Sequence, residues 1–60
     1  MFKEKLPQTQ DEARQYAIDW QNWVSEQNLS YGEIGYYQGI FLELGERFNL
    51  TEEFKENGLI

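Results

Sequence analysis

The sequence predicts an all-α fold: a helical hairpin of two amphipathic helices, followed by a short third C-terminal helix. Apolar residues recur at steps of three and four in two long segments, which is the period of one face of an α-helix. Residues that favour the ends and starts of helices stand between these segments. With 60 residues the chain is long enough for one domain only. We therefore expect a single three-helix domain over residues 9–60, preceded by a flexible N-terminal arm over residues 1–8.

The first helix is expected to begin after Thr9. Pro7 disfavours helix in the residue before it, and Thr9 and Glu12 have the spacing of a capping box. Ile18 falls nearly opposite the apolar stripe of this helix, so we expect its side chain at the surface. The stripe is about 120° wide and consists of Ala13, Tyr16, Ala17, Trp20, Trp23 and Val24. We expect the helix to end near Gln27.

A short junction, Asn28-Leu29-Ser30, leads to the second helix. Asn28 suits the left-handed turn that ends many helices. Ser30 and Glu33 have the spacing of a second capping box, with Leu29 and Ile34 placed as a hydrophobic staple. Because so short a connection leaves no room for another arrangement, we expect the second helix to run back along the first.

The second helix is expected from Tyr31 to about Phe48. Asn49-Leu50-Thr51 then repeats the junction chemistry, with Asn49 ending the second helix and Thr51 capping the third. The apolar seam of the second helix alternates steps of three and four and is widened by Ile40; its members are Ile34, Tyr37, Phe41, Leu44 and Phe48.

The third helix is short and has a recognisable end. Asn57 and Gly58 are expected to terminate it, because glycine adopts the left-handed conformation without strain. Leu59 is then placed to fold back on Phe54 in a Schellman motif.

Four glycines interrupt the second helix, and each costs about 0.5–1 kcal/mol relative to alanine. Gly32, Gly35 and Gly39 share one flank, away from the seam, and Gly45 lies near the seam. The preferred interpretation is that the third helix or the arm covers this flank. The functional alternative is a docking face for a second copy or another protein. Including side chains that lie off the seams, the candidate interaction surface is Ile18, Gly32, Gly35, Tyr36, Gly39 and Leu42.

Composition excludes several classes of function. The chain has no cysteine and no histidine, which removes thiolate nucleophiles and the usual zinc ligands. Its carboxylates recur at three- and four-residue spacing, which is typical of a solvated helix face, and no EF-hand or phosphate-binding loop pattern occurs. We therefore expect no enzymatic activity, no catalytic residues, no cofactor and no metal site.

Charge and hydropathy limit the partners and the location. The net charge is −6 with five basic residues, which argues against direct binding of nucleic acid. No stretch approaches the roughly 18 apolar residues of a membrane span. Lys3 and Lys5 are not followed by the apolar run of a signal peptide, so we expect a soluble, cytoplasmic protein.

Two stretches, 16–23 and 50–58, resemble short uncharacterised helical proteins carried by Gram-positive phages and integrative mobile elements. The resemblance covers residues 10–60 and implies an accessory protein of a mobile element, with no site residues carried over. The first functional hypothesis is a non-enzymatic protein-interaction module, whose partner is another protein or a second copy. The alternative is an acidic DNA mimic that inhibits a host nucleic-acid-binding protein, which requires carboxylates in rows on one face.

Overall fold

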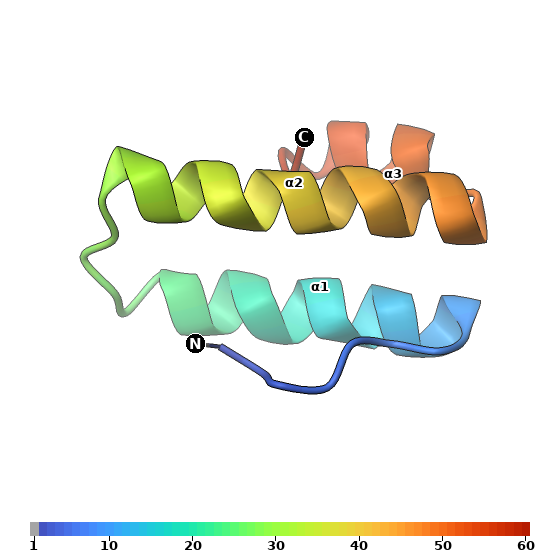
Figure 1. Cartoon of the computed structure of the whole chain (residues 1–60), viewed down its shortest axis with the longest axis horizontal. Coiled ribbons are helices and arrows are strands. Elements are labelled where there is room, and N and C mark those ends of the chain that lie inside the picture. Colours follow the sequence, from blue (N-terminus) through green and yellow to red (C-terminus); the bar gives the residue numbers. More distant parts are fainter. Residues whose placement is uncertain (1) are drawn as a thin grey trace.

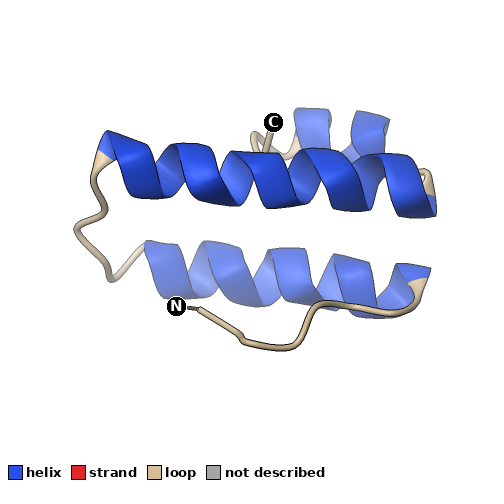
Figure 2. Cartoon of the chain, in the orientation of Figure 1, coloured by secondary structure: helices blue, strands red, loops and turns tan. Residues whose placement is uncertain are grey.

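A computed structural model describes residues 2–60 as three helices and no strand (Figure 2). The helices are α1 (Gln10–Val24), α2 (Tyr31–Phe48) and α3 (Thr51–Glu56). Figure 1 shows α1 and α2 antiparallel, with α3 running back beside the C-terminal half of α2. The predicted all-α hairpin with a short third helix is confirmed.

The core is aromatic and centres on Phe41, which is completely buried. Its ring meets those of Tyr16, Trp20 and Phe54 edge to face, with centroids 5.8, 5.2 and 5.5 Å away. One side chain of α2 therefore joins all three helices, and such aromatic pairs add to the free energy of burial. The other buried residues of the core are Ala13, Ala17, Tyr37, Leu44, Leu50 and Leu59.

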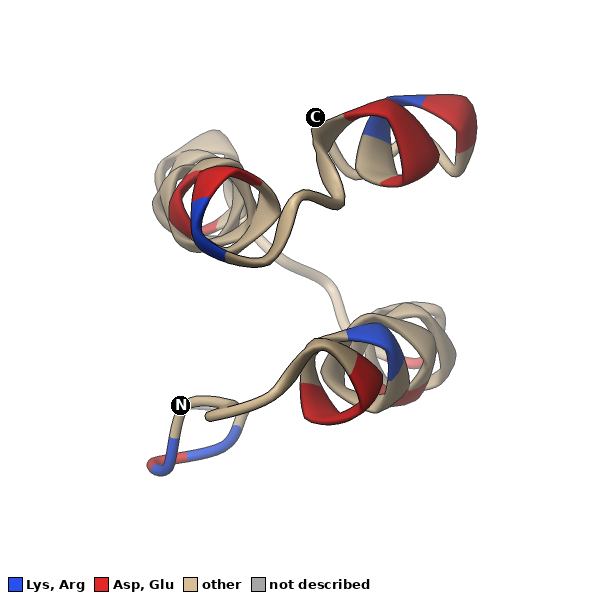
Figure 3. Cartoon of the chain, turned by 90° about the vertical axis from the view of Figure 1, so that its right-hand side faces the viewer, with Lys and Arg blue, Asp and Glu red and all other residues tan. Residues whose placement is uncertain are grey.

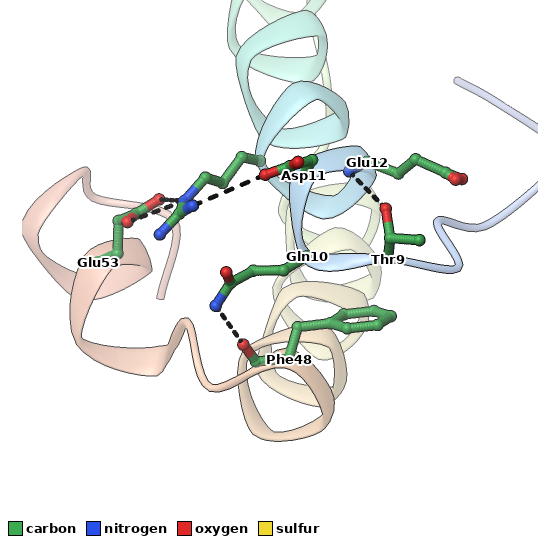
Figure 4. Close-up of polar contacts among 7 residues, drawn as sticks. Thr9, Gln10, Asp11, Glu12, Phe48 and Glu53 are labelled. Atoms are coloured by element: carbon green, nitrogen blue, oxygen red, sulfur yellow. Dashed lines mark hydrogen bonds and ion pairs between the residues drawn. The ribbon is translucent and has the colours of Figure 1, made fainter.

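Polar contacts fasten α1 to the other two helices at one end of the molecule (Figure 4). The Thr9 hydroxyl accepts a hydrogen bond from the Glu12 backbone N–H at 3.1 Å, which confirms Thr9 as the N-cap. Gln10 donates from Nε2 to the Phe48 carbonyl at 3.0 Å, and Arg14 Nε lies 3.0 Å from a Glu53 carboxylate oxygen.

The junction between α1 and α2 differs from its prediction. Helix α1 ends at Val24 rather than near Gln27, and the expectation of a left-handed turn at Asn28 is wrong, because Asn49 is the only non-glycine residue with positive φ among residues 2–60. Tight turns close the helix instead: Glu26 and Gln27 donate to carbonyls three residues back, at 3.2 and 3.0 Å. These bonds satisfy helix-end carbonyls without a left-handed residue.

The start of α2 agrees with its prediction. Ser30 Oγ accepts from the Glu33 backbone N–H at 3.3 Å, and Glu33 Oε1 accepts from the Ser30 backbone N–H at 3.4 Å. The capping box is therefore complete. Two predicted members of the α2 seam are less covered than expected: Ile34 is exposed and Phe48 half-buried.

The junction between α2 and α3 is sharper. Asn49 adopts the predicted left-handed conformation (φ 59°, ψ 43°), and Leu50 donates to the Gly45 carbonyl at 2.8 Å. The prediction that Thr51 caps α3 is wrong: the N-cap is Leu50, and no side chain of the described residues caps this helix. With only Asn49 and Leu50 between the helices, Thr51 already lies in α3 and packs against Gly45.

Helix α3 ends in the predicted Schellman motif. Gly58 has φ 75°, Leu59 donates to the Phe54 carbonyl at 2.8 Å, and Gly58 donates to that of Lys55 at 3.1 Å. Leu59 and Phe54 are both buried, as the hydrophobic contact of this motif requires.

The N-terminal segment lies along α1 and runs antiparallel to it (Figure 1). The Phe2 ring packs against those of Tyr16 and Trp23, with centroids 5.3 and 5.2 Å away. The Phe2 backbone N–H donates to the Tyr37 hydroxyl at 2.8 Å. Lys3 Nζ lies 2.7 Å from an Asp19 carboxylate oxygen. Met1, the first residue of the predicted arm, lies outside the described residues.

Candidate interaction surface

Exposed apolar side chains concentrate in the first part of α2. Tyr31 is 94 % exposed, Tyr36 is 52 % exposed, and Ile34, which lies between them in sequence, is 36 % exposed. Leu42 follows further along the same helix, also exposed. Single exposed apolar residues are ordinary, but folding leaves four of them in contact with water on one helix of 18 residues.

The three glycines of the predicted flank face away from the core. At 100° per residue, Gly32, Gly35 and Gly39 centre about 180° from the buried side chains of α2. Outside the adjacent helix backbone, no atom of residues 2–60 lies within 4 Å of a Cβ built on Gly35 or Gly39. The only neighbour of such an atom on Gly32 is the Ser30 hydroxyl, at 3.9 Å.

The preferred expectation, that α3 or the arm covers this flank, is therefore wrong. Helix α3 packs instead beside Gly45, where a built Cβ would lie 2.9 Å from Thr51 Oγ1 and 3.1 Å from Thr51 Cα. The N-terminal segment packs along α1 instead, because the Phe2 ring contacts the rings of Tyr16 and Trp23 on that helix.

The six predicted surface residues fall into two groups. The glycines form one strip of α2, and Tyr36 and Leu42 flank it on either side by the helical repeat. Ile18 is exposed, as expected, but it lies on the outward face of α1. Because α1 and α2 turn their inner faces toward each other, Ile18 points to the opposite side of the hairpin. The structure brings five of the six residues together.

A groove opens where the hairpin turns. It has a volume of about 300 Å³ and is lined by Trp23, Gln27, Leu29, Glu33, Tyr36 and Tyr37. Sequence reasoning assigned Trp23 and Tyr37 to the core and did not identify the groove. The sequence did contain a signal for the groove, which is the shortness of the third helix. Because α3 is too short to extend from Thr51 along the whole of α2, it covers only the C-terminal half of α2 and leaves the aromatic residues near the hairpin turn uncovered.

Charged groups are distributed unevenly. Every lysine and arginine lies before residue 15 or after residue 46, whereas acidic residues occur throughout the chain. Figure 3 shows basic and acidic residues on all three helices, viewed from the right-hand side of Figure 1. The carboxylates of the hairpin turn, Glu26 and Glu33, thus have no basic residue near them in sequence.

Two ion pairs tie acidic side chains to neighbouring elements. The hydrogen bond from Lys3 holds the pKa of the Asp19 carboxyl below its ordinary value, with a second contribution from Gln15. The hydrogen bond to Glu53 raises the pKa of the Arg14 guanidinium above its ordinary value. Both pairs support the fold, because each joins elements distant in sequence.

A second hollow lies beneath the N-terminal segment and includes Lys3, Pro7, Glu12 and Tyr16 in its lining. The Tyr16 hydroxyl is buried without a hydrogen-bond partner among residues 2–60, and burial raises its pKa. The hollow mixes both signs of charge and shows no preference for one ligand class.

The described residues contain no cluster of three or more carboxylates placed to hold a metal ion. Within the same part of the chain, no helix is long and apolar enough to cross a membrane. No protein-family model matches the sequence, and comparisons with curated proteins and with solved structures found no match.

Proposed function

We propose that the chain is a small non-enzymatic protein-interaction module that binds its partner through α2. The contact surface consists of the open half of the helix, Tyr31–Gly39, with the adjoining groove at the hairpin turn. The observation that carries this proposal is the exposure of Tyr31 and Tyr36 beside glycines that no other segment of the described chain covers. Aromatic residues supply much of the binding free energy in protein interfaces.

The glycines support the same proposal through their cost. In a helix interior each is less favourable than alanine by about 0.5–1 kcal/mol. At Gly45 the packing of α3 offsets this cost, because α3 occupies the space that a side chain would fill. At Gly35 and Gly39 no contact within the described chain offsets the cost, whereas the backbone of a partner packed against this face would offset it.

The charge favours a different protein over a second copy. The helical repeat places Glu43 and Glu46 on the same face as the glycines. Two chains that each carry −6 and meet through this face would bring like charges together. The resemblance to proteins of Gram-positive mobile elements supports an accessory role for such an element, with a host or element protein as partner.

The DNA-mimic alternative draws less support from the arrangement of charges. A mimic needs carboxylates in rows on one face, and here they are spread over three helices (Figure 3). Asp19 and Glu53 are engaged in ion pairs, and Glu33 takes part in the α2 cap.

Capture of proteins from a Gram-positive lysate, quantified by mass spectrometry, tests the proposal with side-specific variants. Tyr36→Ala and Gly39→Leu change the open half of α2, and we expect both to lose the captured partner. Ile18→Ala is the matched control, since Ile18 and Tyr36 are equally exposed, at 52 %, on opposite sides of the hairpin. Loss with the Ile18 variant and retention with both α2 variants would contradict the proposed surface.

Sedimentation separates the two kinds of partner. We expect the chain to remain monomeric at hundreds of micromolar, because its net charge opposes association. A dimer that Gly39→Leu disrupts would instead identify a second copy as the partner.

A further inference from the structure

We propose that the groove at the hairpin turn binds the side-chain ammonium group of a lysine, methylated or not, presented by a partner segment. The inference deepens the proposed function and rests on it, because it names what the partner inserts beside the open half of α2. It is carried by the aromatic walls of the groove, by the charges around it and by its size.

The walls are three aromatic rings set at steep angles to one another. The centroid of the Tyr37 ring lies 5.9 Å from that of Trp23 and 5.4 Å from that of Tyr36, with interplanar angles of 63° and 75°. Rings arranged in this way present faces and edges in several directions. The negatively polarised face of an aromatic ring attracts ammonium groups, and cages of such rings recognise lysine and its methylated forms.

The charge on the lining of the groove is negative. Its charged lining residue is Glu33, and no lysine or arginine occurs between residues 15 and 46. Both capping hydrogen bonds of the Glu33 side chain are made by Oε1, and Oε2 takes part in neither. Glu33 Oε2 can thus accept a hydrogen bond from an ammonium group in the groove without breaking the cap.

The chain itself places an ammonium group on an aromatic ring next to this site. Lys3 Nζ lies 5.4 Å from the centroid of the Phe2 ring, and that ring packs on Trp23. Lys3 is held there by Asp19 and does not line the groove. The volume of about 300 Å³ accommodates an ammonium head with part of its aliphatic stem, which the Leu29 side chain can contact.

A nuclear magnetic resonance titration tests the inference with three short neutral-capped peptides. They differ only at the central residue, which is lysine, trimethyllysine or norleucine, and they are compared at matched ionic strength. We expect both cationic peptides to shift the aromatic resonances of Trp23 and Tyr36, and the norleucine peptide to bind about tenfold more weakly. The ratio between the two cationic peptides identifies which form of lysine is preferred.

Variants locate the effect. Glu33→Gln removes the charge but retains the capping box, since glutamine also serves at that position. We expect it to weaken binding of the lysine peptide about threefold. Glu56→Gln makes the same change of net charge on the exposed surface of α3 and should leave binding unchanged. Tyr36→Leu keeps apolar area, removes one ring and should weaken binding of both cationic peptides.

Equal binding of the lysine and norleucine peptides would overturn the preference for a cation, while leaving a docking role for the groove in place. Equal weakening by Glu33→Gln and Glu56→Gln would assign the attraction to net charge and overturn the site. If no peptide shifts the groove resonances in the millimolar range, the ligand assignment is wrong, whereas the lysate experiment judges the interaction surface separately.

Discussion

The two halves of α2 have the same helical backbone but different surroundings. In the covered half, Ile40–Phe48, the inward side chains Phe41 and Leu44 are buried and Gly45 lies against α3. In the open half, Tyr31–Gly39, only Tyr37 is buried, and Gly35 and Gly39 face away from every other segment described. Glycine thus permits helix packing in the covered half, whereas the glycines of the open half permit no contact within the described chain. This difference makes the open half the part of the molecule that folding explains least.

The largest expected contrast comes from truncating one aromatic residue in each half. Phe41→Ala empties the centre of the core, and we expect a loss of about 3–5 kcal/mol in the free energy of unfolding. Tyr36→Ala removes a half-exposed ring, and its effect should stay below about 1 kcal/mol. Urea unfolding followed by circular dichroism measures both. Equal losses would show that the open half is as well packed as the covered one.

The cap at the start of the open half should have an intermediate effect. Ser30→Ala removes the hydroxyl that accepts from the Glu33 backbone N–H, and we expect it to destabilise the chain by about 1 kcal/mol. Ser30→Asp retains an acceptor and is the control that should restore most of the loss. An unchanged thermal melt for Ser30→Ala would contradict the cap as the device that begins α2.

The smallest expected effect concerns the N-terminal segment, which lies along α1 and contacts the open half of α2. The Phe2 backbone N–H donates a hydrogen bond to the Tyr37 hydroxyl. The neighbouring Lys3 forms an ion pair with Asp19, whose carboxyl pKa is lowered in the folded state. A lowered folded-state pKa gives stability that is present above the unfolded value, about 4, and is lost as pH falls through the folded value.

Asp19→Asn should therefore reduce the loss of stability between neutral and acidic pH, as measured by melts across that range. Asp11→Asn, which removes an almost fully exposed carboxylate of the same helix, is the control. An acid dependence that is identical in wild type and Asp19→Asn would contradict the role of the ion pair.

Local signals in the sequence predicted local structure well. The cap at Ser30, the left-handed Asn49 and the Schellman motif at Gly58 depend on residues close together in sequence, and all three predictions are confirmed. The prediction failed where two similar junctions had to be distinguished. Asn28 and Thr51 have residue types that suit helix ends, but hydrogen bonds to carbonyls three residues back close α1, and Thr51 lies inside α3 against Gly45.

The candidate surface was only partly predictable. The helical repeat placed Gly35, Tyr36 and Gly39 on the outside of α2, but it gave no means of deciding whether another segment covers them. That depended on where α3 and Phe2 pack, which is set by contacts between residues far apart in sequence. Ile18 was included because it is exposed, although exposure alone does not specify a side of the hairpin.

The most direct test of the difference between the two halves compares one alanine substitution in each. Gly45→Ala must displace Thr51, whose backbone lies 3.1 Å from the new methyl group, and we expect a loss of about 1–3 kcal/mol in the free energy of unfolding. Gly39→Ala adds a methyl group in open space and should instead increase it by about 0.5–1 kcal/mol. Opposite signs in one urea series are the predicted result. A loss of similar size at both positions would show that the folded chain already uses the glycine face and would contradict its assignment to a partner.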